Sequence, residues 1–75
     1  MTLKALLEQK KMKQSELARC FVEVKHYKFQ QQISGWVNGV RLPDFWSLFY
    51  MAKILNCPVD EVANAVFETF KGVEQ

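Results

Sequence analysis

The sequence has little of what small metal-binding, redox or disulfide-stabilised domains depend on. It contains one histidine, His26, and two cysteines, Cys20 and Cys57, which lie far apart and form no CxxC pair. A single histidine without neighbouring ligands does not make a metal site, so we expect no metal. Two well-separated cysteines indicate small buried side chains rather than a redox pair.

The residue patterns of catalysis are also missing. The only histidine has no partner nucleophile in the sequence pattern, and the three glycines do not make a phosphate-binding loop. The paired acids Asp60 and Glu61 fall at an expected helix start, where they complement the helix dipole. We therefore expect no enzyme activity, no cofactor and no small-molecule substrate.

Long hydrophobic runs are absent as well. No stretch approaches the roughly 18 uninterrupted apolar residues of a membrane span, and no signal peptide pattern opens the chain. We therefore expect a cytoplasmic protein with no membrane partner. Hydrophobic residues still make up 49% of the 75 residues, enough for one core, so we expect a single domain over residues 1–75.

Charge is distributed unevenly along the chain. Residues 1–43 carry eight lysines and arginines against three glutamates, a net charge of +5. Residues 44–75 carry two lysines against five acids, a net charge of −3. A basic half joined to an acidic half is typical of a protein with one face toward a polyanion, although chance clustering on a solvated surface gives the same pattern.

Apolar spacing is helical nearly throughout the chain and predicts five helices with short connections. The first covers about 3–11 with Thr2 as N-cap, the second about 14–24, and the third 30–37, ended by Asn38 and Gly39. A fourth runs between Asp44, its N-cap, and Asn56, and a fifth runs from Val59 to Gly72. The expected core consists of Leu3, Leu6, Leu7, Met12, Leu17, Ala18, Phe21, Val24, Ile33, Trp36, Val37, Val40, Leu48, Met51, Ala52, Leu55, Val59, Val62, Ala63, Val66, Phe67 and Phe70. The predicted fold class is all-α, a compact five-helix cluster.

Two segments resemble a known family. The first is Lys13-Gln14-Ser15-Glu16-Leu17-Ala18. The second runs from Ile33-Ser34-Gly35-Trp36-Val37-Asn38-Gly39 through Val40-Arg41-Leu42-Pro43 and continues to Leu48, Ala52-Lys53, Leu55 and Val59-Asp60-Glu61-Val62. Together they resemble the lambda-repressor-like helix-turn-helix family, which includes the Cro and repressor DNA-binding domains of phages.

The resemblance implies a way of docking on double-stranded DNA. The helix at 30–37 would lie in the major groove, while the helix at about 14–24 crosses the backbone. The base-contacting residues implied are Gln30, Gln31, Gln32 and Ser34. The phosphate-contacting residues are Lys13, Gln14, Lys25, Lys28, Asn38, Gly39 and Arg41. Chemistry agrees for the glutamines, because an amide pairs with N6 and N7 of adenine; without the flanking motif, a solvated polar turn fits three consecutive glutamines as well.

The chain departs from the family pattern in three places. Ala18 and Ile33 are 15 positions apart, against about ten in the family, so the second helix is longer or the turn is an enlarged loop. In a loop, Lys25, His26 and Lys28 would contact the DNA backbone, and Tyr27 and Phe29 would anchor on the core. Gly35 stands where the family often has a long polar side chain, which suggests close approach to DNA or base reading by the glutamines alone. Lys13 replaces the usual Ser or Thr cap, at a cost of about 1 kcal/mol.

The favoured function is a sequence-specific transcription regulator, a Cro-like repressor that binds a two-fold operator as a homodimer in the bacterial nucleoid. The dimer-interface candidates are Trp46, Phe67 and Phe70. The alternative is a protein-interaction module, of antitoxin or accessory type, that uses the fold without reading bases. The run Phe45, Trp46, Phe49 and Tyr50 motivates it, because one helix face cannot bury all four rings.

Overall fold

The computed structural model describes residues 1–73 and the side chains of residues 1–70. Five helices and no strand occur within residues 1–73, which confirms the predicted all-α class for that part of the chain. The helices are α1 (Leu3–Gln9), α2 (Gln14–Glu23), α3 (Gln30–Val37), α4 (Phe45–Leu55) and α5 (Val59–Val73). The predicted single domain extends to residue 75, and its last two residues lie outside the described part.

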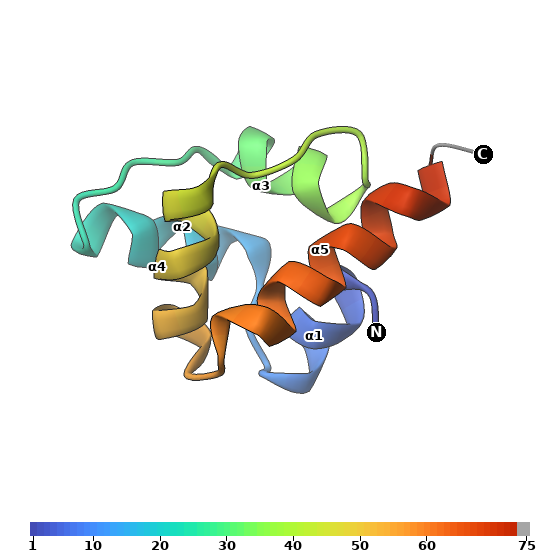
Figure 1. The fold of residues 1–75 in the computed structure, drawn as a ribbon. Helices are drawn as coiled ribbons and strands as arrows, with labels where there is room; N and C mark the ends of the chain where they lie inside the picture. The colour runs from blue at the N-terminus through green and yellow to red at the C-terminus, as the bar shows by residue number, and fades with distance from the viewer. Residues whose placement is uncertain (74–75) are drawn as a thin grey trace.

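The longest helix, α5, organises the others. It packs against α4, α1 and α3, while α2 packs against α3 and α4 (Figure 1). The N-terminus lies beside α5, where the Met1 ammonium group forms an ion pair with Glu68 and the Leu3 amide donates to Thr69 Oγ1 at 2.8 Å. No helix within the described residues is both long enough and apolar enough to cross a bilayer.

Apolar side chains from all five helices meet in one core. Its buried members are Leu3, Leu6, Leu7, Leu17, Phe21, Ile33, Trp36, Met51, Ala52, Leu55, Val62, Ala65 and Val66. Phe21 is fully buried, and its ring meets that of Trp36 edge to face at 6.0 Å. This contact joins α2 to α3 inside the core and so fixes the placement of α3.

Several helix ends follow the predicted chemistry. Thr2 caps α1 by accepting from the Ala5 amide at 3.2 Å, and α1 ends two residues earlier than predicted. Asn56 ends α4 in the left-handed conformation, and Gly39 takes positive φ after α3. Asp44 occupies the N-cap position of α4, but its carboxylate makes no capping bond to the backbone.

Four of the expected core residues lie on the surface instead. Val24 follows the last turn of α2, and Val40 lies in the loop after α3, so the helical spacing that placed them inside no longer applies. Val59 begins α5 at its exposed end, and Phe67 is exposed on α5. Cys20 and Cys57 are free thiols and only half-buried, where buried side chains were expected.

Candidate nucleic-acid interface

The N-terminal end of α3 presents three of the predicted base-contacting residues, Gln30, Gln31 and Gln32. Ile33 and Trp36 are buried on the inner face of the helix, which leaves Gln30 and Gln31 exposed to solvent. Gln32 is exposed too, but its Oε1 accepts a hydrogen bond from the Phe29 amide at 2.9 Å. This bond satisfies one of the free amides at the helix start. Gln30 and Gln31 therefore keep their whole amide groups for a partner, whereas Gln32 has one end occupied.

The start of α2 lies beside the start of α3. Lys13, Gln14 and Gln30 line the same shallow hollow between these two helices and α1. Half of a capping box is present at the start of α2, because Glu16 Oε1 accepts from the Lys13 amide at 3.0 Å, whereas the Lys13 side chain makes no cap bond. The structure thus brings together two predicted phosphate contacts and one predicted base contact.

The C-terminal end of α3 carries a predicted base contact, Ser34, and two predicted phosphate contacts, Asn38 and Gly39. Asn38 Nδ2 donates to Ser34 Oγ at 3.3 Å, so these two side chains pair with each other one turn apart. Ser34 is half-buried, and its hydroxyl already has this donor. Gly39 is buried with φ of 77°, a conformation that suits glycine and turns the chain back across the helix.

Arg41 lies over α3 at Gly35. The amides of Val40 and Arg41 both donate to the Gly35 carbonyl, at 3.0 and 3.3 Å. A Cβ atom on Gly35 would lie 3.3 Å from Arg41 Cδ. Gly35 is therefore buried beneath the stem of Arg41, which favours base reading by the glutamines over close approach of DNA to this glycine. The long polar side chain in this region comes from the loop instead of the helix.

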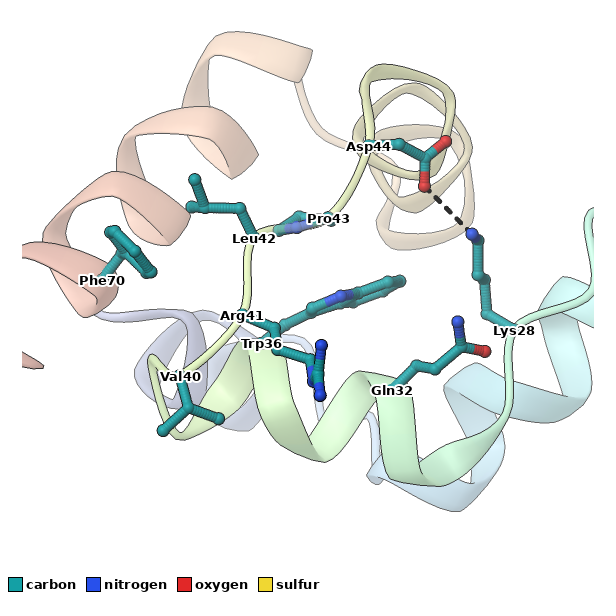
Figure 2. A pocket seen from close by; sticks show the side chains of 9 residues that line it. All are labelled: Lys28, Gln32, Trp36, Val40, Arg41, Leu42, Pro43, Asp44 and Phe70. Carbon is teal, nitrogen blue, oxygen red and sulfur yellow. Dashed lines mark ion pairs between the residues drawn. The ribbon is translucent and has the colours of Figure 1, made fainter.

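A polar hollow of about 450 Å³ opens beside α3. Lys28, Gln32 and Arg41 surround the ring of Trp36, and Phe70 of α5 closes the opposite end (Figure 2). The Lys28 ammonium group forms an ion pair with Asp44 at 3.1 Å. This pairing neutralises much of the charge of Lys28, so Arg41 supplies most of the positive charge in the hollow.

Residues 24–29 form a loop, which decides between the two alternatives that the spacing left open. Lys25 takes positive φ after α2, and His26–Phe29 has no helical structure. His26 and Lys28 point toward Asp44 at the start of α4, with His26 Nε2 3.7 Å from the carboxylate. Tyr27 and Phe29 are 63% and 73% exposed. The anchoring residues are thus His26 and Lys28, and the predicted anchoring by the two aromatic rings is wrong.

Ser47 completes the anchor of this loop. It is the one buried polar side chain among residues 1–70, and its hydroxyl donates to Asp44 Oδ1 at 2.6 Å. The Ser47 Oγ atom also lies 3.1 Å from His26 Nε2. Serine has one hydroxyl hydrogen, and Ser47 uses it in the hydrogen bond to Asp44. In the contact between His26 and Ser47, His26 Nε2 is therefore the donor. The His26 ring also stacks on Tyr50 at 4.9 Å.

The anchor makes Asp44 more acidic than an ordinary aspartate. The hydrogen bond from Ser47 is the main cause that lowers its pKa to about 2, helped by the hydrogen bond and charge of Lys28 and opposed by partial burial. Asp44 is therefore ionised at neutral pH.

Just beyond the other end of α4, burial together with the nearby charge of Glu61 raises the pKa of the Cys57 thiol, which disfavours the reactive thiolate.

The dimer-interface candidates come from two helices, α4 and α5. Trp46 on α4 is 56% exposed, and Phe67 on α5 is 65% exposed. Phe70 is half-buried and lines the polar hollow near α3. Trp46 belongs to a continuous set of ring contacts, because it meets Phe45 at 5.2 Å and Phe49 at 5.7 Å.

No three histidine, cysteine, aspartate or glutamate side chains gather as metal ligands would within the described residues. The sequence pattern did not predict the anchor formed by His26, Lys28, Asp44 and Ser47. Its one local signal is the spacing of Asp44 and Ser47 at a helix start, where residues three apart meet.

No protein-family model matches the chain, and no curated protein or solved structure does.

Proposed function

We propose that this protein is a sequence-specific regulator that binds double-stranded DNA through a lambda-repressor-like helix-turn-helix formed by α2 and α3. It acts as a Cro-like repressor, in which the N-terminal end of α3 enters the major groove. One observation carries the proposal: Gln30 and Gln31 are exposed with free amide groups on a helix whose other face is fixed in the core. A glutamine amide on a rigid helix matches the N6 and N7 edge of adenine.

The proposed phosphate contacts come from the start of α2, the end of α2 and the loop after α3. Lys13 and Gln14 lie beside Gln30, and Arg41 extends over the helix from the following loop. Lys25 adds a charge at the end of α2, where it is exposed. Contacts to phosphates on both sides of the groove position the reading helix without adding sequence information. Asn38 is exposed and remains a proposed phosphate contact at the C-terminal end of α3. The Gly39 amide is buried and donates to the Trp36 carbonyl at 3.2 Å, so it is not retained as a phosphate contact.

A domain of this size reads only a few base pairs, so useful affinity calls for two copies on a two-fold operator. The half-sites then lie one helical turn, about 34 Å, apart. Repression follows when the dimer occupies DNA that a polymerase needs. The protein works in the cytoplasm on nucleoid DNA, and it requires no cofactor.

The test is selection of binding sites from random double-stranded DNA with the intact protein. We expect an enriched two-fold sequence whose affinity falls with salt, at a log–log slope of about −0.9 per phosphate neutralised. Gln31→Ala should weaken the selected site by about 1–3 kcal/mol and relax one base position. Asn64→Ala, which removes an exposed amide from α5, is the matched control. Failure to enrich any sequence at low salt contradicts the proposal.

A second candidate function is a protein-interaction module without base reading. The observation in its favour is the aromatic surface at the start of α4, where Phe45 and Trp46 are 64% and 56% exposed. Exposed apolar patches rimmed by polar residues mark interaction sites. This candidate predicts that Phe45→Ala and Trp46→Ala change partner binding, while substitutions on α3 leave it unchanged.

A further inference from the structure

The loop before α3 holds two aromatic rings away from the protein. Over residues 26–29 the side chains alternate: His26 and Lys28 turn toward Asp44, and Tyr27 and Phe29 turn to solvent. This alternation is that of extended backbone, in which successive side chains point to opposite sides. Figure 1 shows the segment running from the end of α2 past the start of α4 to α3.

The backbone of this segment is fixed near both ends. At the α2 end the His26 amide donates to the Phe21 carbonyl at 3.0 Å. At the α3 end the Phe29 amide donates to Gln32 Oε1 at 2.9 Å. Between them, the Lys28 ammonium group is paired with Asp44 at 3.1 Å. Phe29 is therefore presented on a held backbone, and little conformational freedom remains to be lost when it meets a partner.

Phe29 stands next to the residues that the proposed function places against bases. It is the N-cap residue of α3, it is 73% exposed, and Gln30 follows it directly. An A·T pair offers two features in the major groove: the N6 and N7 edge of adenine, which suits an amide, and the C5-methyl group of thymine, which suits an apolar side chain. A glutamine and a phenylalanine side by side provide one group for each.

We propose that Phe29 reads the C5-methyl group of a thymine in the major groove, beside the adenine contacted by Gln30 or Gln31. Tyr27 lies two residues back on the same side of the extended segment, about 6.6 Å away along the backbone. Its hydroxyl group then faces the sugar–phosphate backbone that borders that thymine. The inference rests on the proposed function and assigns the exposed aromatic residues of the enlarged loop to sequence recognition.

The experiment replaces thymine by deoxyuridine, one position at a time, in the DNA selected by the intact protein. Deoxyuridine keeps the base pair and removes only the C5-methyl group. We expect one position in each half-site at which wild-type affinity falls about fourfold, the effect of burying one methyl group. Phe29→Ala should bind the thymine site more weakly and should no longer distinguish thymine from deoxyuridine there.

Two control variants separate this contact from its neighbours. Tyr27→Ala and Gln31→Ala should bind more weakly yet keep the wild-type ratio of thymine to deoxyuridine affinities. Because Phe29 is mostly exposed, Phe29→Ala should keep the wild-type melting temperature, which shows that the variant is folded. If Phe29→Leu keeps part of the preference for thymine over deoxyuridine, the contact is an apolar one to the methyl group and does not require stacking of an aromatic ring.

The failures of the two proposals are distinguishable. If the selected DNA binds with the expected salt slope, but wild type tolerates deoxyuridine everywhere, the thymine contact is overturned and DNA reading stands. The thymine contact is also overturned if Phe29→Ala keeps the discrimination, or if no thymine occurs in the selected half-site. If no DNA is enriched, both proposals fail, and the exposed rings belong to a protein interface.

Discussion

The side chain of Arg41 lies across Gly35, with its Cδ atom 3.3 Å from the position that a Cβ atom on residue 35 would take. Glycine inside a helix costs about 1 kcal/mol relative to alanine. The fold keeps this glycine at the point where the Arg41 stem passes closest to α3. Two effects of a Gly35→Ala substitution therefore oppose each other: the helix gains stability, and Arg41 must move.

We predict that Gly35→Ala leaves the unfolding free energy unchanged or raises it by up to about 1 kcal/mol, because the long Arg41 side chain can shift by a few tenths of an ångström. If Arg41 makes the proposed phosphate contact, DNA affinity should fall as the guanidinium group moves away from that phosphate. The log–log salt slope should then decrease in magnitude by up to about 0.9, the value for one phosphate. Thermal unfolding and salt-dependent binding measure the two effects. Arg41→Ala should reproduce the change in slope; a normal slope in both variants would show that Arg41 contacts no phosphate.

Acid should weaken the fold through Asp44. Its pKa in the folded protein is about 2, below the ordinary value of 3.8. The unfolded chain therefore binds more protons between these values, so this contribution to stability is present above about pH 4 and is lost as pH falls toward 2. Because the carboxylate is half-exposed, salt should reduce the effect.

We predict that Asp44→Asn is less stable than wild type at neutral pH and that the difference shrinks as the pH falls from 4 to 2. Denaturant unfolding across that range gives the free energies. Asp60→Asn, at an exposed carboxylate in the first turn of α5, is the control and should retain the wild-type dependence on pH. Parallel pH curves for wild type and Asp44→Asn would contradict the assignment.

Ser47→Ala should release the loop before α3. The hydroxyl group accepts from His26 and donates to Asp44, so its loss leaves a partly buried ring N–H without this acceptor. We expect a loss of about 1–3 kcal/mol in unfolding free energy. Hydrogen exchange should also accelerate at the His26 amide, which is bonded to Phe21 in wild type. Ser15→Ala, at an exposed position in α2, is the control; unchanged exchange at His26 in Ser47→Ala would argue against the anchor.

Helices were the predictable part of this fold, since apolar spacing and end residues act locally. The predicted bounds of α3 agree with the structure, because Ile33 and Trp36 define its inner face and Gly39 ends it. The same periodicity failed just beyond helix ends. Val24 stands seven residues after Leu17, but α2 ends at Glu23, so Val24 leaves the buried face.

The loop at 24–29 was not predictable in detail, because its contacts are long-range and polar. Asp44 is 16 residues beyond Lys28, and no periodic pattern links a lysine to a carboxylate at that distance. Hydrophobicity pointed to Tyr27 and Phe29 as the anchors. The ion pair and the buried Ser47 hold His26 and Lys28 inward instead, which leaves the two rings on the surface.

The exposed aromatic surface of α4 leads to a prediction about assembly. Phe45, Trp46 and Phe49 meet edge to face, so they form one apolar surface, whereas Phe67 lies on another helix. Tryptophan in such a setting is the residue type that contributes most to interfaces. We predict that Trp46→Ala raises the dissociation constant of the proposed homodimer by about tenfold or more, a change exceeding about 1 kcal/mol.

Sedimentation equilibrium over a range of protein concentrations measures this effect. Trp46 is 56% exposed, so the variant should keep its fold and its melting temperature at low protein concentration, where monomer prevails. Phe67→Ala, which removes a ring of similar exposure from α5, is the matched comparison and should change the dissociation constant less. The reverse order would move the interface to α5. Because two-fold operator binding requires the dimer, Trp46→Ala should also weaken binding to the full operator while leaving half-site affinity unchanged.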